Sequence, residues 1–133
     1  METEELNRLS SVIVNACIEV HRTMGPGLLE KVYEHCLMKE FELRGIKAKS
    51  QVEVNLNYKG FDLNKTLTVD ILVEDEIILE LKSVEQLNPV FEAQLISYLK
   101  LADKRLGFLL NFNVPLMKQG IFRRVNKFDL CEP

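Results

Sequence analysis

Three ionisable side chains lie within two segments that otherwise have the composition of buried strands. Asp70 interrupts the apolar segment Thr66–Val73. Glu80 and Lys82 interrupt a second one, Glu76–Ser83, and being two positions apart they share a face, about 6.6–6.8 Å from each other along a strand. Charged groups are costly to bury unless they are paired or bind a metal. Two carboxylates beside an ammonium are what a hydrolytic magnesium site requires, because the carboxylates hold the ion and the ammonium lies beside the attacking water.

A purely structural interpretation of the same residues is also open. The charges could project from the solvent face of a sheet, with Lys82 in a cross-strand ion pair with Asp70 or Glu80, which contributes little when exposed. The two interpretations overlap, because an active-site lysine also pairs with such carboxylates when the metal is absent. The functional interpretation requires all three side chains to meet on one side of the sheet.

The sequence before these segments predicts two helices and a strand. Apolar residues recur every three or four positions over Thr3–Thr23 and Leu28–Arg44, and the break between these helices is Met24–Gly27. The alternating segment Gln51–Tyr58 predicts a half-buried strand, after which Lys59-Gly60 turns the chain.

The remaining elements complete an α/β pattern. The short connection at Glu74-Asp75 predicts that the two charged segments form an antiparallel hairpin. A third helix is expected over Val90–Ala102, after Asn88-Pro89, and then a buried strand over Arg105–Asn111 that could lie parallel to an earlier one. With a last edge strand at Ile121–Val125, the order ααβββαβ(β) predicts a mixed β-sheet flanked by helices.

Length and composition indicate one ordinary globular domain, residues 1–133. The chain is 47% apolar and 28% charged, and we expect disorder only near Met1–Glu5 and Asp129–Pro133. Its net charge of −3 argues against a protein that coats nucleic acid through bulk charge. It does not argue against a nuclease, whose metal-binding carboxylates are themselves negative. Two local basic clusters are interpreted as solvated surface: Lys100, Lys104 and Arg105, and Arg123, Arg124 and Lys127.

The cysteines do not form a disulfide framework. Their number is odd, and Cys17 and Cys36 lie in helical apolar patterns, so we interpret both as small buried hydrophobes, with Cys131 near the end of the chain. Short paired spacings of the C-x₂-C kind are missing, so His21 and His35 are not assigned to a zinc site. The start of the chain is acidic, and no apolar run is long enough to cross a bilayer. We therefore expect a cytoplasmic protein without membrane association.

A set of short motifs occurs in a defined order along the chain. The segment Gly27–Tyr33 reads G-x-x-E-x-x-Y. It is followed by Asp70, by Glu80-Leu81-Lys82 and by Gln94–Tyr98. E-x-K alone is common by chance, but the ordered set resembles the GxxExxY proteins, a branch of the PD-(D/E)XK nuclease superfamily, from about Leu6 to Asn126.

The resemblance implies a restriction-endonuclease-like core, with a helix, a three-stranded antiparallel portion, another helix and a further strand. One departure is that Val69 precedes Asp70 where the name-giving motif has proline. A proline side chain ligates nothing, so the substitution removes no chemistry.

The resemblance also implies a role for each residue at the metal. Asp70 and Glu80 would bind Mg²⁺ or Mn²⁺, the backbone carbonyl of Leu81 would add a ligand, and Lys82 would orient or activate the attacking water. Glu30 would be a further ligand for the metal or for water, delivered from a helix. The helix macrodipole alone is an alternative explanation for Glu30, because acidic residues are favoured in a first helical turn.

Three further polar residues are candidates for positioning. Gln94 would orient the water or contact the nucleic-acid backbone, and Tyr98 shares its helix face four residues later. Tyr33 shares a face with Glu30 and could bind a carboxylate or a phosphate. The alternatives are a core tyrosine with a satisfied hydroxyl, and a partly buried amide of Gln94 paired with Tyr98.

The sequence therefore predicts a Mg²⁺-dependent nuclease that hydrolyses phosphodiester bonds, with DNA as the expected substrate. Two rival functions remain open. The first is a catalytically silent module that binds nucleic acid or protein on the same scaffold, and the second is hydrolysis of another phosphate ester such as a nucleotide. A homodimer would provide the recognition surface that so short a chain lacks.

Overall fold

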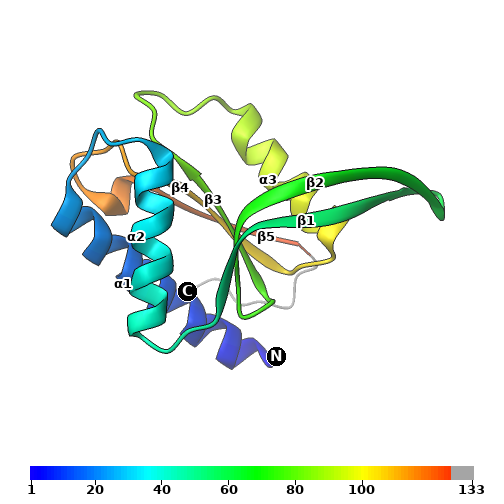
Figure 1. Cartoon of the computed structure of the whole chain (residues 1–133), viewed down its shortest axis with the longest axis horizontal. Helices are drawn as coiled ribbons and strands as arrows, with labels where there is room; N and C mark the ends of the chain where they lie inside the picture. Colours follow the sequence, from blue (N-terminus) through cyan, green and yellow to red (C-terminus); the bar gives the residue numbers. More distant parts are fainter. Residues whose placement is uncertain (127–133) are drawn as a thin grey trace.

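The computed structural model describes residues 1–126 and is built around one five-stranded sheet in the order β1-β2-β3-β4-β5 (Figure 1). The strands are β1 (Ala48–Tyr58), β2 (Phe61–Val73), β3 (Ile77–Lys82), β4 (Leu106–Asn111) and β5 (Ile121–Val125). The helices are α1 (Thr3–Met24), α2 (Glu30–Leu43), α3 (Val90–Ala102) and a short 3₁₀ helix, η1 (Met117–Gly120). The predicted element order and the α/β class with a mixed sheet flanked by helices are confirmed.

Two apolar cores lie on opposite faces of the sheet. The larger core joins α1 and α2 to one face, through residues such as Ile13, Leu37 and Phe108. The smaller core joins α3 to the other face, where Leu95 and Leu99 pack against the sheet. Burial of these faces on both sides explains why every residue of β4 is buried, while β1 alternates between partly buried and exposed residues.

The hairpin between the two charged strands has the predicted antiparallel pairing. Ile71 pairs with Leu79 and Val73 with Ile77. The connection has three residues, Glu74 to Glu76, and the first two have positive φ, 51° and 59°. The Glu76 N–H donates to the Val73 carbonyl at 2.9 Å, so Glu74 and Asp75 are the central residues of a β-turn whose positive φ values suit the strand twist. After α3 crosses over, β4 lies parallel to β3, as expected for a strand that follows a crossover helix.

Strand β2 changes the face that it presents at Asp70. In a regular strand, residues two apart share a face. Here Ile71 belongs to the core under α1 and α2, whereas Val69 belongs to the core under α3. The neighbouring strand is irregular at the same level, because Gln51, which lies between the pairs Ser50–Ile71 and Val52–Val69, has a φ of 52°. A positive φ is uncommon for a residue with a side chain, and it occurs at the level at which β2 changes face.

Some boundaries differ from the prediction. Strand β2 begins at Phe61, five residues before the predicted start. The expected disorder at Met1–Glu5 is wrong, because α1 begins at Thr3 and the amino group of Met1 lies 3.6 Å from Glu76. The expected disorder at Asp129–Pro133, together with Cys131 and Lys127, lies outside the described residues.

The two cysteines of the described part of the chain are free, and Cys17 is fully buried in the larger core while Cys36 is partly buried against it. Burial raises the pKa of the Cys17 thiol to about 12. Across residues 1–126, no helix combines the length and the apolar character needed to span a bilayer.

Candidate active site

Two carboxylates meet where β2 and β3 separate. The backbone pairing of the strands reaches Ile71 and Leu79, and the next two residues in register are Asp70 and Glu80. There, side chains replace the backbone ladder: Glu80 Oε2 accepts a hydrogen bond from the Asp70 N–H at 3.0 Å. In turn, Asp70 Oδ2 accepts one from the Leu81 N–H at 2.8 Å. These reciprocal bonds hold the two acidic groups side by side.

The pair has an unusual protonation equilibrium. Glu80 is only 8% exposed. Burial, and secondly the negative charge of Asp70, raise the pKa of Glu80 to about 8. The metal-free protein therefore keeps a proton on this pair at neutral pH, and a divalent cation would displace it.

Lys82 lies on the same side of the sheet. Its ammonium lies 4.2 Å from the centre of the Phe91 ring, on α3, and its charge lowers the pKa of Glu80 against the larger opposing effects. Within residues 1–126, no ion pair closer than 4.0 Å joins Lys82 to Asp70 or Glu80, so the cross-strand salt bridge is not formed. The ammonium of Lys82 instead makes a cation–π contact with the ring of Phe91.

The helix α3 brings a hydroxyl near the carboxylates. Tyr98 is half-buried, and its pKa is raised, first by burial and then by the negative charges of Glu80 and Asp70. Gln94, one turn earlier, is exposed and has no hydrogen bond to any described residue, so the amide pair with Tyr98 is not formed. Both residues lie on α3, which packs on the face of the sheet that carries Lys82.

Glu30 begins α2 and is exposed. The next acidic residue on that face, Glu34, is buried and accepts a hydrogen bond from Gln51 Nε2 at 2.8 Å. Gln51 lies between the pairs Ser50–Ile71 and Val52–Val69, at the level of Asp70 in the neighbouring strand. Sequence reasoning missed Glu34 and Gln51, although the spacing of four from Glu30 to Glu34 could have indicated a common face.

Tyr33 is fully buried and stacks on Phe112, with ring centres 4.4 Å apart. Its hydroxyl donates to the Gly25 carbonyl and accepts from the Leu28 N–H. These contacts fasten the loop before α2, so we leave Tyr33 out of the proposed site. His21 likewise has a structural contact, with Nε2 2.8 Å from the Val114 carbonyl oxygen.

Asn111, which sequence reasoning did not single out, holds the chain that follows Lys82. It lies beside Lys82 across the β3–β4 pairing and is 4% exposed. Its side chain accepts from the Val84 N–H and donates to the Val84 carbonyl, at 3.1 and 3.0 Å. Its oxygen also accepts from the Asn113 N–H at 3.2 Å. The amide therefore fixes the exit of β3.

We expect Asn111→Ala to lower the free energy of unfolding by about 2–3 kcal/mol, because buried backbone groups lose their partners. Urea unfolding measures this. Asn55→Ala, on an exposed strand, is the matched control and should change stability by less than about 0.5 kcal/mol. Equal effects of the two substitutions would contradict the role given to Asn111.

The donor chemistry at Asp70 and Glu80 fits a hard divalent cation. Mg²⁺ takes oxygen ligands, keeps several waters and is commonly held by one or two carboxylates plus substrate phosphate. In the part of the chain that the structure describes, no group of three or more His, Cys, Asp or Glu side chains is arranged to hold a metal. Glu30 is thus not clustered with the two carboxylates, and its role and that of the Leu81 carbonyl stay predictions.

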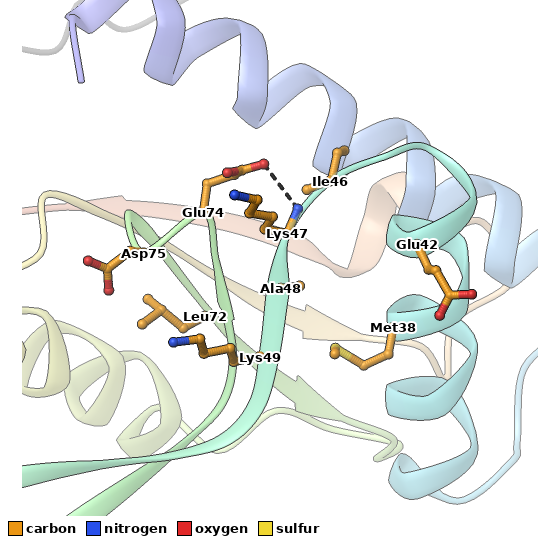
Figure 2. A pocket seen from close by; sticks show the side chains of 9 residues that line it. All are labelled: Met38, Glu42, Ile46, Lys47, Ala48, Lys49, Leu72, Glu74 and Asp75. Carbon is orange, nitrogen blue, oxygen red and sulfur yellow. Dashed lines mark hydrogen bonds between the residues drawn. The ribbon is translucent and has the colours of Figure 1, made fainter.

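A separate hollow of about 540 Å³ opens beside the edge strand β1 (Figure 2). It is lined by Met38, Glu42, Ile46, Lys47, Ala48, Lys49, Leu72, Glu74 and Asp75. Glu74 closes one side by accepting a hydrogen bond from the Lys47 N–H at 3.0 Å. Neither Asp70 nor Glu80 lines this hollow, so it is distinct from the carboxylate site.

Comparison with known proteins agrees with the geometry. A family model described as the PD-(D/E)XK nuclease superfamily matches residues 7–125. Searches of curated proteins and of solved structures give no match. The match covers nearly all of the described residues and includes both charged strands. The chain therefore belongs to the PD-(D/E)XK nuclease superfamily.

Proposed function

We propose that this protein is a Mg²⁺- or Mn²⁺-dependent nuclease that hydrolyses phosphodiester bonds in DNA. The observation that carries the proposal is the meeting of Asp70 and Glu80 at the point where β2 and β3 separate, with Lys82 two residues after Glu80 and its charge acting on that carboxyl group. When bound, the cation supplies Lewis-acid polarisation of the phosphodiester and activation of water.

The residues of the chain have distinct tasks in this proposal. Asp70 and Glu80 bind the cation, and the backbone N–H groups that they accept from hold both carboxylates in place. Lys82 stabilises negative charge that develops on the phosphoryl oxygens and orients the water. Gln94 and Tyr98 face the substrate from α3, where the exposed amide can reach a phosphate and the hydroxyl lies near the carboxylates.

The proposal also includes a compartment and an oligomeric state for the protein. The expected compartment is the cytoplasm, where the free thiols of Cys17 and Cys36 would stay reduced. A homodimer would add recognition surface and present two sites to the two strands of a duplex. Sedimentation of the purified chain, with and without DNA, tests the dimer directly.

A substrate panel tests the activity. Plasmid, single-stranded DNA, RNA and nucleotides are incubated with Mg²⁺ or Mn²⁺, and we expect cleavage of DNA that stops on chelation. Lys82→Ala should lower the rate by about 10²–10³-fold, the loss typical of removing one group that stabilises transition-state charge. Lys100→Ala, on the exposed face of α3, is the matched control and should cleave at the normal rate. Metal-independent cleavage, or an unaffected Lys82→Ala variant, would contradict the assignment.

A further inference from the structure

The paired ends of β1 and β2 extend beyond the rest of the sheet as a two-stranded arm (Figure 1). Strand β3 pairs with β2 only at Ile71–Val73. Beyond that level, β1 and β2 pair only with each other, as at Asn55–Thr66 and Tyr58–Phe61. We call residues 52–69 the arm.

One side of the arm is apolar and its far end is uncovered. Near the sheet, Val52, Val54 and Leu67 pack against the core under α3. At the tip, Tyr58 is 60% and Phe61 73% exposed. Exposed aromatic rings are the side chains on which unpaired bases stack.

The arm carries two lysines, Lys59 and Lys65, and two acidic residues, Glu53 and Asp62. Within residues 1–126, neither Lys59 nor Lys65 has an acidic partner, and Lys59 lies 5.4 Å from the centre of the Tyr58 ring. In contrast, Lys104 pairs with Asp75 and Arg124 with Glu92. Lys59 and Lys65 therefore offer cations that no carboxylate pairs with, beside exposed aromatic faces, although the formal charges of the arm sum to zero.

The arm is continuous with the proposed active site. Asp70 is the residue at which β2 leaves the three-stranded part of the sheet, and Phe61 lies nine positions earlier in the same strand. Nine residues of strand span about 30 Å. A nucleic-acid strand with a phosphate at Asp70 could thus follow the arm to its tip.

We propose that the arm binds unpaired bases of the nucleic acid, which stack on Tyr58 and Phe61 while Lys59 and Lys65 bind phosphates. Bases inside a duplex are already stacked on each other, so exposed rings select single strands, gaps or tails. The proposal deepens the proposed function and rests on it for the path of the strand toward Asp70.

Fluorescence anisotropy in the presence of EDTA tests the arm on the full chain. The probes are a labelled single strand, a blunt duplex of the same length and a duplex with a single-stranded tail. The double variant Tyr58→Ala and Phe61→Ala should bind the single strand and the tailed duplex at least about tenfold more weakly, with little change for the blunt duplex. The control removes two equally exposed leucines elsewhere, Leu43→Ala and Leu116→Ala, and should bind normally.

The charges are tested by salt dependence. The double variant Lys59→Gln and Lys65→Gln should lower the slope of log affinity against log salt for the single strand by about 0.7 for each phosphate that is no longer neutralised. An unchanged slope would show that these lysines bind no phosphate.

Three outcomes would overturn the proposal that the arm binds unpaired bases. They are no binding of any probe, equal binding of the single strand by the aromatic variant and the wild type, and an aromatic variant whose only defect is a loss of self-association in sedimentation. Hydrolysis of bis(p-nitrophenyl) phosphate, too small to reach the tip, separates the arm from the catalytic proposal. The aromatic variant should keep that hydrolysis. Binding that depends on Tyr58 and Phe61, without hydrolysis of any substrate, would refute the proposed nuclease activity and support the proposed role of the arm.

Discussion

Replacing Asp70 with asparagine should abolish metal-dependent cleavage, with a loss of about 10³-fold or more, equivalent to about 4 kcal/mol of transition-state stabilisation. The amide oxygen of the variant can still accept the hydrogen bond from the Leu81 N–H, so the strands should stay joined. The negative charge that would hold the cation in the proposed site is lost. Cleavage of DNA with Mn²⁺ measures the effect, and circular dichroism verifies the fold.

The matched control is Asp75→Asn. Asp75 lies in the turn between the same two strands, is exposed, and has a positive φ that asparagine tolerates. It should cleave at the normal rate. An Asp70→Asn variant that retains cleavage comparable to that of the control would exclude Asp70 from the metal site.

Replacing Glu80 with glutamine should stabilise the metal-free protein at alkaline pH while abolishing metal binding. The raised pKa of Glu80, about 8, means that the native state keeps a proton that the unfolded chain has already released. Between the ordinary glutamate pKa and about 8, the native state binds more protons, so the free energy of unfolding falls as the pH rises, by up to about 1.4 kcal/mol per pH unit.

Glutamine does not ionise, so the variant should escape this loss. At pH 9 we expect it to be about 2–4 kcal/mol more stable than the wild type in EDTA, with little difference at pH 5. Urea unfolding at both pH values measures the effect. Glu85→Gln, exposed in the loop before α3, is the control and should follow the wild-type profile. Parallel profiles for Glu80→Gln and the wild type would show that Glu80 ionises normally.

Metal binding should release the proton that the Asp70–Glu80 pair keeps at neutral pH. In the proposed site Mn²⁺ would bind the ionised pair, so at pH 7 about one proton should leave for each ion bound, and the affinity should rise about tenfold per pH unit up to about pH 8. Calorimetry in two buffers with different ionisation enthalpies measures the release. Binding without proton release would indicate that the cation uses other ligands.

Much of the fold could be predicted, because hydrophobic periodicity reflects which faces are buried. The helix Val90–Ala102 and the strand Ile121–Val125 have the predicted bounds. The start of β2 at Phe61 could not be predicted, since the arm has no helix over its outer half and therefore lacks a regular alternation of buried and exposed residues.

The charged residues of the candidate site could be predicted from the sequence, but the contacts that position them could not. Asp70 and Glu80 are conspicuous in apolar strands, and the structure brings them together. The change of face at Asp70 occurs at the level of the positive φ of Gln51, and no residue pattern indicates either feature. The seat of Lys82 on Phe91 and the hydrogen bonds of Asn111 join elements distant in sequence, so they arise only from the tertiary fold.

The reciprocal bonds between Asp70 and Glu80 have an evolutionary consequence. Both acids act only as acceptors toward the backbone N–H groups of the opposite strand. Asparagine and glutamine could accept the same bonds, so the architecture alone has no need of acids. A descendant released from selection for hydrolysis would be free to drift to amides at these two positions and would gain heat resistance in alkaline conditions. Acids that persist there mark a lineage still under selection for chemistry.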